Sequence, residues 1–146
     1  EPQDSGEYSW KELYRDPLVA WLPKNHPKAK QKTYKIKDLE TEDFIHTLPG
    51  QDTDQDRLIK QEGLNLQTRF TTKDGFTTYQ MVKAGLGVSF NQAMIARDWK
   101  EEVVQVPLSP KHFVSLGIAL PKKEKTSPAV QRFMDCLDSW LKDLLK

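Results

Sequence analysis

The longest regular pattern of apolar residues in this chain lies near its C-terminal end. Apolar side chains recur there at spacings of three and four residues, so they fall on one stripe of a helix: Val130, Phe133, Met134, Leu137, Trp140, Leu141 and Leu144. Ser127 stands where a helix cap is expected, and Pro128 fits the first helical position. The pattern predicts a long amphipathic helix as the last element.

Short apolar or alternating runs bounded by turn residues predict the strands. The run "LVAWL" at residues 18–22 ends at Pro23 and is typical of a buried strand. Five further strands are expected at residues 43–47, 65–71, 86–90, 103–106 and 113–120.

Helices are predicted between these strands. Residues 54–62 follow Thr53, a suitable N-cap, with Asp56 three positions later in an imperfect capping box, and Gly63 ends the segment. Two more helices are expected, one from a cap at Thr72 or Asp74 through Lys83 and a short one over residues 91–98. Strands that alternate with helices are typical of an α/β fold, here with a largely parallel sheet.

Length and composition fit a globular chain. The 146 residues are enough for one domain or two small lobes, and no apolar run approaches the ~18 residues of a membrane span. The polar, acidic start lacks the pattern of a signal peptide. Cys136 is the one cysteine, so no internal disulfide is expected, which favours a reducing, cytoplasmic location.

The net charge of +1 argues against nucleic-acid binding through bulk charge, yet the charges are segregated. Six lysines lie between residues 24 and 37, and seven acids follow between residues 38 and 56. Only Tyr34 is aromatic within the basic stretch, whereas a polyanion site favours several interleaved aromatics. We interpret the two stretches as a solvated loop and a solvated acidic edge.

Two glycines in "MVKAGLGVSFNQ", Gly85 and Gly87, raise the question of a phosphate-binding loop. A dinucleotide fingerprint needs a strand, then three glycines, then a helix. Here Phe90 occupies the third glycine position, and the predicted order is helix, glycines, strand. Gly85 is therefore interpreted as a helix end, and Gly87 as a site of close backbone approach or bending.

No catalytic or metal site is predicted. His26, His46 and His112 are not spaced as paired ligands and have no nearby cysteine, so neither zinc nor another cofactor is expected. Cys136 lies beside the apolar stripe and is interpreted as a packed thiol. His46 ends a strand before a turn, where it is either a solvent-facing edge residue or a ligand contact.

Binding is expected where helices follow strands, because helix N-termini point backbone N–H groups outward at the carboxyl ends of strands. Two stretches fit, "HTLPGQDT" and "TTKDGF", and they supply neutral polar side chains: Thr47, Gln51, Thr71 and Thr72. Asp52, Asp54 and Asp56 lie in or next to the first helical turn, where their negative charges already balance the positive end of the helix dipole. We expect weak attraction for small anions, or a ligand that also carries an amine.

Five segments in order resemble the effector-binding domain of LysR-type transcriptional regulators. They are "LYRDPLVAWLPKNHPKA", "KIKDLETEDFI", "MVKAGLGVSF", "VVQVPLS" and "SPAVQRFMDCLDSWL", and they cover nearly the whole chain from Leu13. The resemblance implies two α/β lobes like a periplasmic binding protein, joined by two crossing strands, with a small effector in the cleft. It implies that the domain senses the effector by binding it and does not catalyse a reaction on it. A stand-alone solute-binding protein is the alternative.

The resemblance also implies a domain organisation. Residues 1–16 would be a tail leading to the first hinge strand, residues 17–90 the second lobe, and residues 91–146 the C-terminal part of the first lobe. The family's N-terminal helix-turn-helix and the opening of the first lobe have no counterpart in the chain, so DNA contact is expected only through that absent part. Exposed strand edges around residues 103–120 are then expected to favour self-association.

The resemblance places effector contacts on several segments. The effector loop of the second lobe matches His46, Thr47, Leu48, Pro49 and Gly50. Further candidates are Trp21 on the first crossing strand, which is either a contact or a core residue, and Ser89 and Asn91 on the second. Thr72, at the second helix start described above, is added to them on that ground and not from the resemblance. Asn91 stands where the family usually has proline. The hinge is expected at Leu18, Val19, Gly85 and Gly87, and the effector is expected to be an organic acid or a zwitterion.

Overall fold

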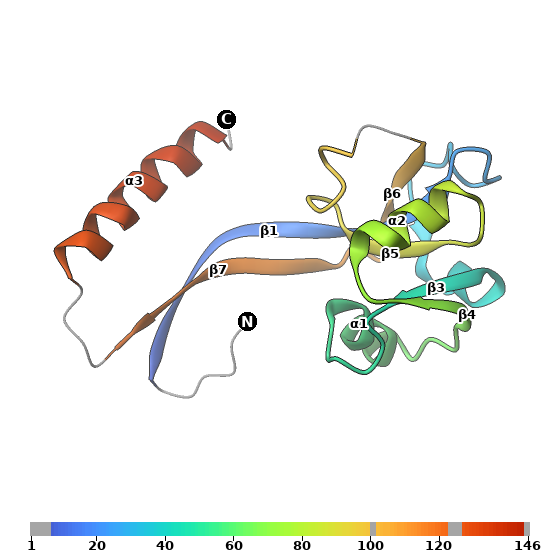
Figure 1. The fold of residues 1–146 in the computed structure, drawn as a ribbon, viewed down its shortest axis with the longest axis horizontal. Helices are drawn as coiled ribbons and strands as arrows, with labels where there is room; N and C mark the ends of the chain where they lie inside the picture. Colours follow the sequence, from blue (N-terminus) through green and yellow to red (C-terminus); the bar gives the residue numbers. More distant parts are fainter. Residues whose placement is uncertain (1–6, 100–101, 123–126, 145–146) are drawn as a thin grey trace. The chain divides into compact units, whose positions relative to one another are not determined.

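Strand β1 (Tyr8–Pro23) is the longest strand of the chain (Figure 1). The structure, a computed structural model, describes residues 7–99, 102–122 and 127–144. The chain divides into two compact units, a larger one over Asp16–Val114 and a smaller one that combines Glu1–Arg15 with Ser115–Lys146. No helix within the described residues is long and apolar enough to cross a membrane.

In the larger unit, β1 pairs with two antiparallel neighbours. Strand β5 (Ser89–Gln92) lies on one side and β6 (Val103–Ser109) on the other, so that Ala20 is opposite both Phe90 and Val106. The short β2 (Tyr34–Lys35) joins β6 in parallel. The expectation of a largely parallel sheet is therefore wrong for this sheet, and β6 is an inner strand between β1 and β2 rather than a sheet edge.

Parallel pairing occurs in a two-stranded sheet that adjoins the first sheet beside β5. Strand β3 (Asp43–Thr47) pairs in parallel with β4 (Gln67–Thr72), and a parallel bridge from Phe44 to Val88 connects β3 with the segment that enters β5. Hydrogen bonds from Ile45 N to Val88 O and from Val88 N to Asp43 O, both 2.9 Å, hold this connection. Strands β3, β4 and β5 consequently end at the same edge.

Local signals fix the two helices of this unit. Helix α1 (Asp54–Glu62) begins with a complete capping box of Thr53 and Asp56 and ends at Gly63, whose φ is 57°. Helix α2 (Gly75–Lys83) is capped by Asp74, which decides between the two predicted caps. A short 3₁₀ helix, η1 (Ile36–Thr41), precedes β3.

The helix expected over residues 91–98 does not form. Strand β5 continues to Gln92, and turns follow it. The N–H of Ala93 donates to Pro17 O at 2.9 Å, and the N–H of Met94 donates to the buried carboxylate of Asp16 at 3.1 Å. Asn91 and Gln92 stay extended because they pair with Val19 and Leu18 of β1, and the two bonds hold the turns that follow against the same strand.

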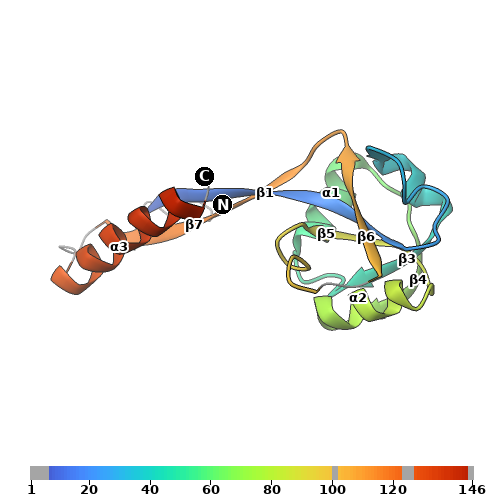
Figure 2. The same cartoon turned by 90° about the horizontal axis from the view of Figure 1, so that it is seen from above.

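Two apolar clusters lie on the two faces of β1. Leu18, Ala20 and Leu22 belong to a cluster that also contains Tyr34, Leu39, Phe44, Leu58, Phe90 and Leu108. Val19 and Trp21 belong to the other, with Ile45, Tyr79, Val82 and Ala96. Because successive side chains of a strand alternate, β1 serves both clusters and is buried on both faces. Helices α1 and α2 lie on opposite sides of β3 and β4 (Figures 1 and 2).

The smaller unit contains the start of β1, most of strand β7 (Phe113–Pro121) and helix α3 (Pro128–Leu144). The predicted cap is confirmed, because Val130 N donates to Ser127 Oγ at 3.3 Å. Lys11 Nζ binds the Asp138 carboxylate at 2.6 Å. The apolar stripe of α3 forms as predicted, but of its described side chains only Met134 is buried, and Val130, Phe133 and Trp140 are exposed.

The two glycines of "MVKAGLGVSFNQ" serve different purposes. Gly85 has a φ of 75° and follows the last turn of α2, and a Cβ added to it would contact nothing. A Cβ on Gly87 would clash with the carbonyl oxygen of Asp43 in β3. Gly85 therefore relieves backbone strain, whereas Gly87 allows β3 and β5 to approach.

This difference predicts unequal effects of alanine at the two glycines. Gly85→Ala should cost about 1–2 kcal/mol, the strain of a left-handed alanine. Gly87→Ala should cost about 3 kcal/mol or more, because backbone atoms of β3 must move to make room. Urea denaturation of the two variants measures both losses. Equal losses would contradict the assignment of Gly87 to close strand packing.

Candidate functional site

The carboxyl ends of β3, β4 and β5 form one edge of the larger unit (Figure 2). Leu48 N donates to Thr72 O at 2.9 Å and joins the ends of β3 and β4, and Gln92 Nε2 at the end of β5 donates to Asp54 Oδ2 at the start of α1 at 2.7 Å. The segments at this edge carry four exposed large apolar side chains, Leu48, Phe76, Met94 and Ile95. Ligands of open α/β sheets bind at such edges. We call it the binding edge.

Three buried threonines lie beneath the binding edge. Thr47 ends β3, Thr72 ends β4, and Thr78 lies in α2. The Thr78 hydroxyl is 2.7 Å from that of Thr47 and 2.5 Å from that of Thr72. The carbonyl oxygen of Asp74 lies 3.2 Å from the Thr72 hydroxyl and 3.1 Å from that of Thr78. The cluster ties two strand ends to the start of a helix.

Gln55 of α1 makes a second buried connection, with only 4% of its surface exposed. Its Oε1 accepts from Thr47 N at 2.9 Å. Its Nε2 donates to Phe90 O at 2.5 Å and to Ser89 Oγ at 3.1 Å, and the Ser89 hydroxyl donates in turn to Ile45 O at 2.8 Å. One neutral amide thus joins α1, β3 and β5 without leaving a buried charge.

The loop after β3 has an unusual backbone. Leu48 and Asp52 adopt left-handed conformations, with φ of 48° and 53°, and Gly50 has a φ of 76°. Such a conformation costs a residue with a side chain about 1–2 kcal/mol. Leu48 is nevertheless 38% exposed, so its own burial does not offset the strain. Left-handed residues held by their surroundings are frequent at ligand-binding sites.

Carboxylates hold the loop from the side of α1. Burial alone would raise the pKa of Asp56, but backbone N–H groups of Thr53 and Gly50, together with nearby His46, outweigh it and lower the pKa. His46 Nε2 lies 2.9 Å from Asp56 Oδ1. At the start of α2, the backbone N–H and the hydroxyl of Thr77 lower the pKa of Asp74.

The structure brings most of the predicted effector residues to the binding edge. Thr47, Leu48, Pro49, Gly50 and Thr72 lie at the ends of β3 and β4. His46 is directed at Asp56, and Asn91 lies at the end of β5, where its Oδ1 accepts from Gln92 N at 3.1 Å. Their contacts with an effector stay predictions.

Two predicted effector residues lie inside the unit instead. Ser89 is fully buried and bonded to Ile45 and Gln55. Trp21 is also fully buried, with its ring 5.6 Å from that of Tyr79 and 6.2 Å from that of Trp99. The predicted hinge residues Leu18 and Val19 are buried in β1, paired with β5.

Sequence reasoning missed Gln55 and Thr78. Both were detectable as polar residues on the apolar face of a helix. Gln55 shares a face with Leu58 and Ile59 in α1, and Thr78 lies one turn before Val82 in α2. A polar residue at such a position needs a buried partner, which marks it for attention.

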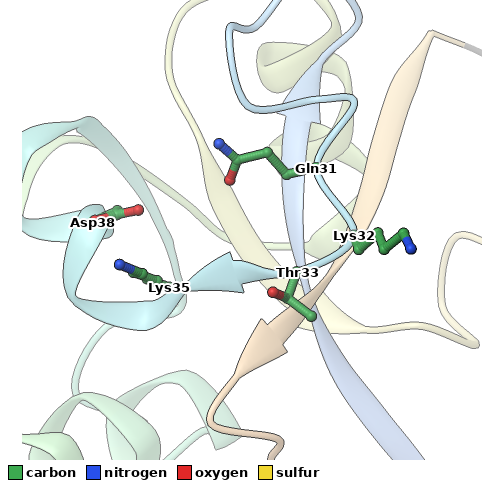
Figure 3. Close-up of a pocket in the computed structure, with 5 residues that line it drawn as sticks. All are labelled: Gln31, Lys32, Thr33, Lys35 and Asp38. Atoms are coloured by element: carbon green, nitrogen blue, oxygen red, sulfur yellow. The ribbon is translucent and has the colours of Figure 1, made fainter.

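A separate hollow of about 400 Å³ lies beside the basic loop, lined by Gln31, Lys32, Thr33, Lys35 and Asp38. Figure 3 shows Gln31 and Lys35 extending toward Asp38, while Lys32 points away. Asp38 already pairs with Lys28 at 3.2 Å. This hollow contains none of the predicted effector residues. Within the described ranges, no three His, Cys, Asp or Glu side chains are grouped to hold a metal.

The role of Gln55 predicts a large loss on removal of its amide. Gln55→Leu should cost about 2–4 kcal/mol, because the N–H of Thr47 and the carbonyl of Phe90 lose buried partners. Gln61→Leu on the same helix, at an exposed position, should change stability by about 0.5 kcal/mol or less. Urea denaturation compares them. Similar losses in both variants would show that the buried amide is dispensable.

The lowered pKa of Asp56 predicts a pH dependence. A depressed carboxyl pKa contributes stability above the unfolded value of about 3.9, and this contribution is lost as the pH falls through the folded pKa. Asp56→Asn should therefore be less stable than the native chain by about 1 kcal/mol at about pH 6, and the difference should shrink toward about pH 3. Denaturation midpoints across this range measure it, with Asp98→Asn, an exposed acid, as control. A difference independent of pH would contradict the assignment.

Comparison with known proteins now identifies the family. The model of the LysR substrate binding domain matches residues 1–142. Among curated relatives, the transcriptional dual regulator GltC of Bacillus subtilis is 27% identical over 92% of the chain, and the regulator YnfL of Escherichia coli is 29% identical over 83%. The chain spans less than half the length of these relatives, 46% of GltC and 42% of YnfL.

Solved structures show the same fold. The regulatory domain of Synechocystis CcmR, in complex with 2-PG, matches 97% of the chain and 71% of its own with a TM-score of 0.81 and 20% identity. The effector binding domain of QuiR, in complex with shikimate, matches 98% of the chain and 69% of its own with a TM-score of 0.77 and 18% identity. The chain therefore belongs to the LysR substrate-binding domain family.

Proposed function

We propose that the chain is the effector-sensing regulatory domain of a LysR-type transcriptional regulator and that it binds a small molecule at the binding edge. The observation that carries this proposal is the loop after β3, where Leu48 is held in a left-handed conformation and remains exposed. The complexes of CcmR with 2-PG and of QuiR with shikimate support a small-molecule ligand.

The chemistry of the binding edge suits a small organic molecule. Leu48, Phe76, Met94 and Ile95 offer apolar surface, and polar groups lie between them. The hydrogen bonds of Gln55 and the threonine cluster hold the loop before a ligand arrives. A site that is already ordered loses less entropy on binding.

The effect on DNA would follow from a shift in conformational populations. An effector changes an equilibrium only by the difference between its affinities for two states. The full regulator would act in the cytoplasm as an oligomer, bind DNA through a helix-turn-helix, and respond when the effector favours one arrangement of its domains. No cofactor is required, and the effector leaves unchanged.

A ligand screen with matched variants tests the binding site. Organic acids and zwitterions are screened by thermal shift. For a hit, Leu48→Ser should weaken binding at least about tenfold, because it removes apolar contact. Leu86→Ser is the control, since Leu86 is similarly exposed but follows α2, away from the binding edge. Equal affinities for both variants would place the ligand elsewhere.

The regulatory part of the proposal needs a separate measurement. The full regulator is titrated onto its own promoter DNA with and without the hit, and the dissociation constants are compared. A difference of about five-fold or more is expected from typical coupling free energies. Tight effector binding with no change in DNA affinity or DNA bending would contradict a sensing role.

A further inference from the structure

We infer that the effector is recognised at the binding edge through hydrogen-bond donors that it carries itself, such as an ammonium or hydroxyl group, and not as a bare anion. This inference rests on the proposed function. It follows from an account of the donors in the loop after β3 and in the threonine cluster, because a donor that is already bonded within the protein is not available to a ligand.

The backbone donors of the loop are all used internally. Thr47 N donates to Gln55 Oε1 and Leu48 N to Thr72 O, both at 2.9 Å. Pro49 has no N–H, Gly50 N donates to the Asp56 carboxylate, and Gln51 N donates to Leu48 O at 3.3 Å. From Thr47 to Gln51 the backbone can therefore offer a ligand only carbonyl oxygens.

The hydroxyl protons can be counted in the same way. Thr47, Thr72 and Thr78 have three hydroxyl protons for four contacts, two between hydroxyls and two with the carbonyl oxygen of Asp74. Within this cluster, the Thr47 hydroxyl contacts only that of Thr78. If the Thr47 proton does not point to Thr78, only the protons of Thr72 and Thr78 remain, and the cluster has at most two hydrogen bonds. The cluster reaches three hydrogen bonds only when Thr47 donates to Thr78. The Thr47 oxygen then presents only lone pairs to a ligand.

The helix starts beside this loop each have a side-chain cap. The hydroxyl of Thr53 accepts from Asp56 N at 3.2 Å at the start of α1, and the carboxylate of Asp74 accepts from Thr77 N at 2.7 Å at the start of α2. The carboxylates that accept from these helix starts, Asp56 and Asp74, are negative. Arg57 lies 2.7 Å from the Asp52 carboxylate and 4.0 Å from that of Asp54, so those two acids add little further charge. The potential beside Asp56 and Asp74 favours a cationic group over an anionic one.

Several described side chains near the binding edge still have donors to offer. Among them are the amides of Gln51 and Asn91, the hydroxyl of Thr71 and the ammonium of Lys73. Of these four, all but Asn91 are exposed, and Lys73 is the one with a positive charge. An anion bound here would depend on Lys73, whereas a donor group would meet the Thr47 oxygen and the loop carbonyls.

A matched pair of probes separates these cases. Phenethylamine and 3-phenylpropionate share a ring and two methylenes and differ in the charged group. Each is titrated into the isotope-labelled chain at equal ionic strength, and the amide signals of Thr47, Leu48 and Thr72 are followed by NMR. We expect both probes to move these signals, with the amine binding at least about tenfold tighter, a difference of about 1.4 kcal/mol.

Thr78 tests whether the threonine cluster causes this preference. Thr78→Val removes the acceptor for the Thr47 proton, which then can turn toward a ligand, so the ratio of amine to carboxylate affinity should fall at least threefold. Thr78→Ser keeps the hydroxyl and should keep the ratio. A ratio compares two probes on one variant, so a general loss of stability does not produce the expected change. Lys73→Gln should leave the amine affinity at or above that of the native chain.

The outcomes distinguish this inference from the proposed function. Tighter binding of the carboxylate at the same amide signals would overturn the inference and leave a small-molecule site in place. An unchanged ratio in Thr78→Val would also overturn it, by removing the threonine cluster as the cause. If neither probe moved the signals of Thr47, Leu48 and Thr72, the proposed binding edge itself would be contradicted, and the inference with it.

Discussion

The buried amide of Gln55 is the interaction on which the binding edge depends. It reaches from α1 to the last residue of β3 and to β5, so it sets the position from which the loop after β3 departs. An amide suits this task because it is both donor and acceptor, and it needs no counter-charge in a low-dielectric interior. The threonine cluster does the same for β4 and α2 with hydroxyl groups.

The packing around β1 explains why these polar connections are tolerated. Apolar side chains fill both faces of the strand, with Phe44 and Phe90 on one side and Tyr79 and Val82 on the other. The amide of Gln55 and the hydroxyls of the threonine cluster lie beside these clusters, where each has hydrogen-bond partners. Burial thus strengthens the hydrogen bonds that shape the loop, while the apolar clusters supply the stability.

Features that depend on a few neighbouring residues could be predicted from the sequence. The caps at Thr53 and Ser127 and the stop at Gly63 follow from local hydrogen bonding, and the structure has all three. The turns after Gln92 could not be predicted, because Met94 N donates to Asp16, 78 positions earlier in the chain. Likewise, the antiparallel pairing of β1 depends on partners far away in the sequence.

The candidate site was predictable to a similar degree. Turn residues after β3 marked the loop. The burial of Trp21, in contrast, could not be predicted from the alternating pattern of its strand. Alternation predicts which side chains share a face, yet the docking of α2 and the approach of Trp99 decide whether that face is covered. The aromatic contacts leave Trp21 fully buried.

Leu48 places stability and recognition in opposition. Glycine at this position would relieve about 1–2 kcal/mol of backbone strain, but it would also remove apolar surface from the binding edge. Selection for higher stability and selection for higher effector affinity would therefore favour different residues at position 48. A lineage that loses its effector should drift there toward glycine or asparagine, whereas one that keeps it should retain a large side chain.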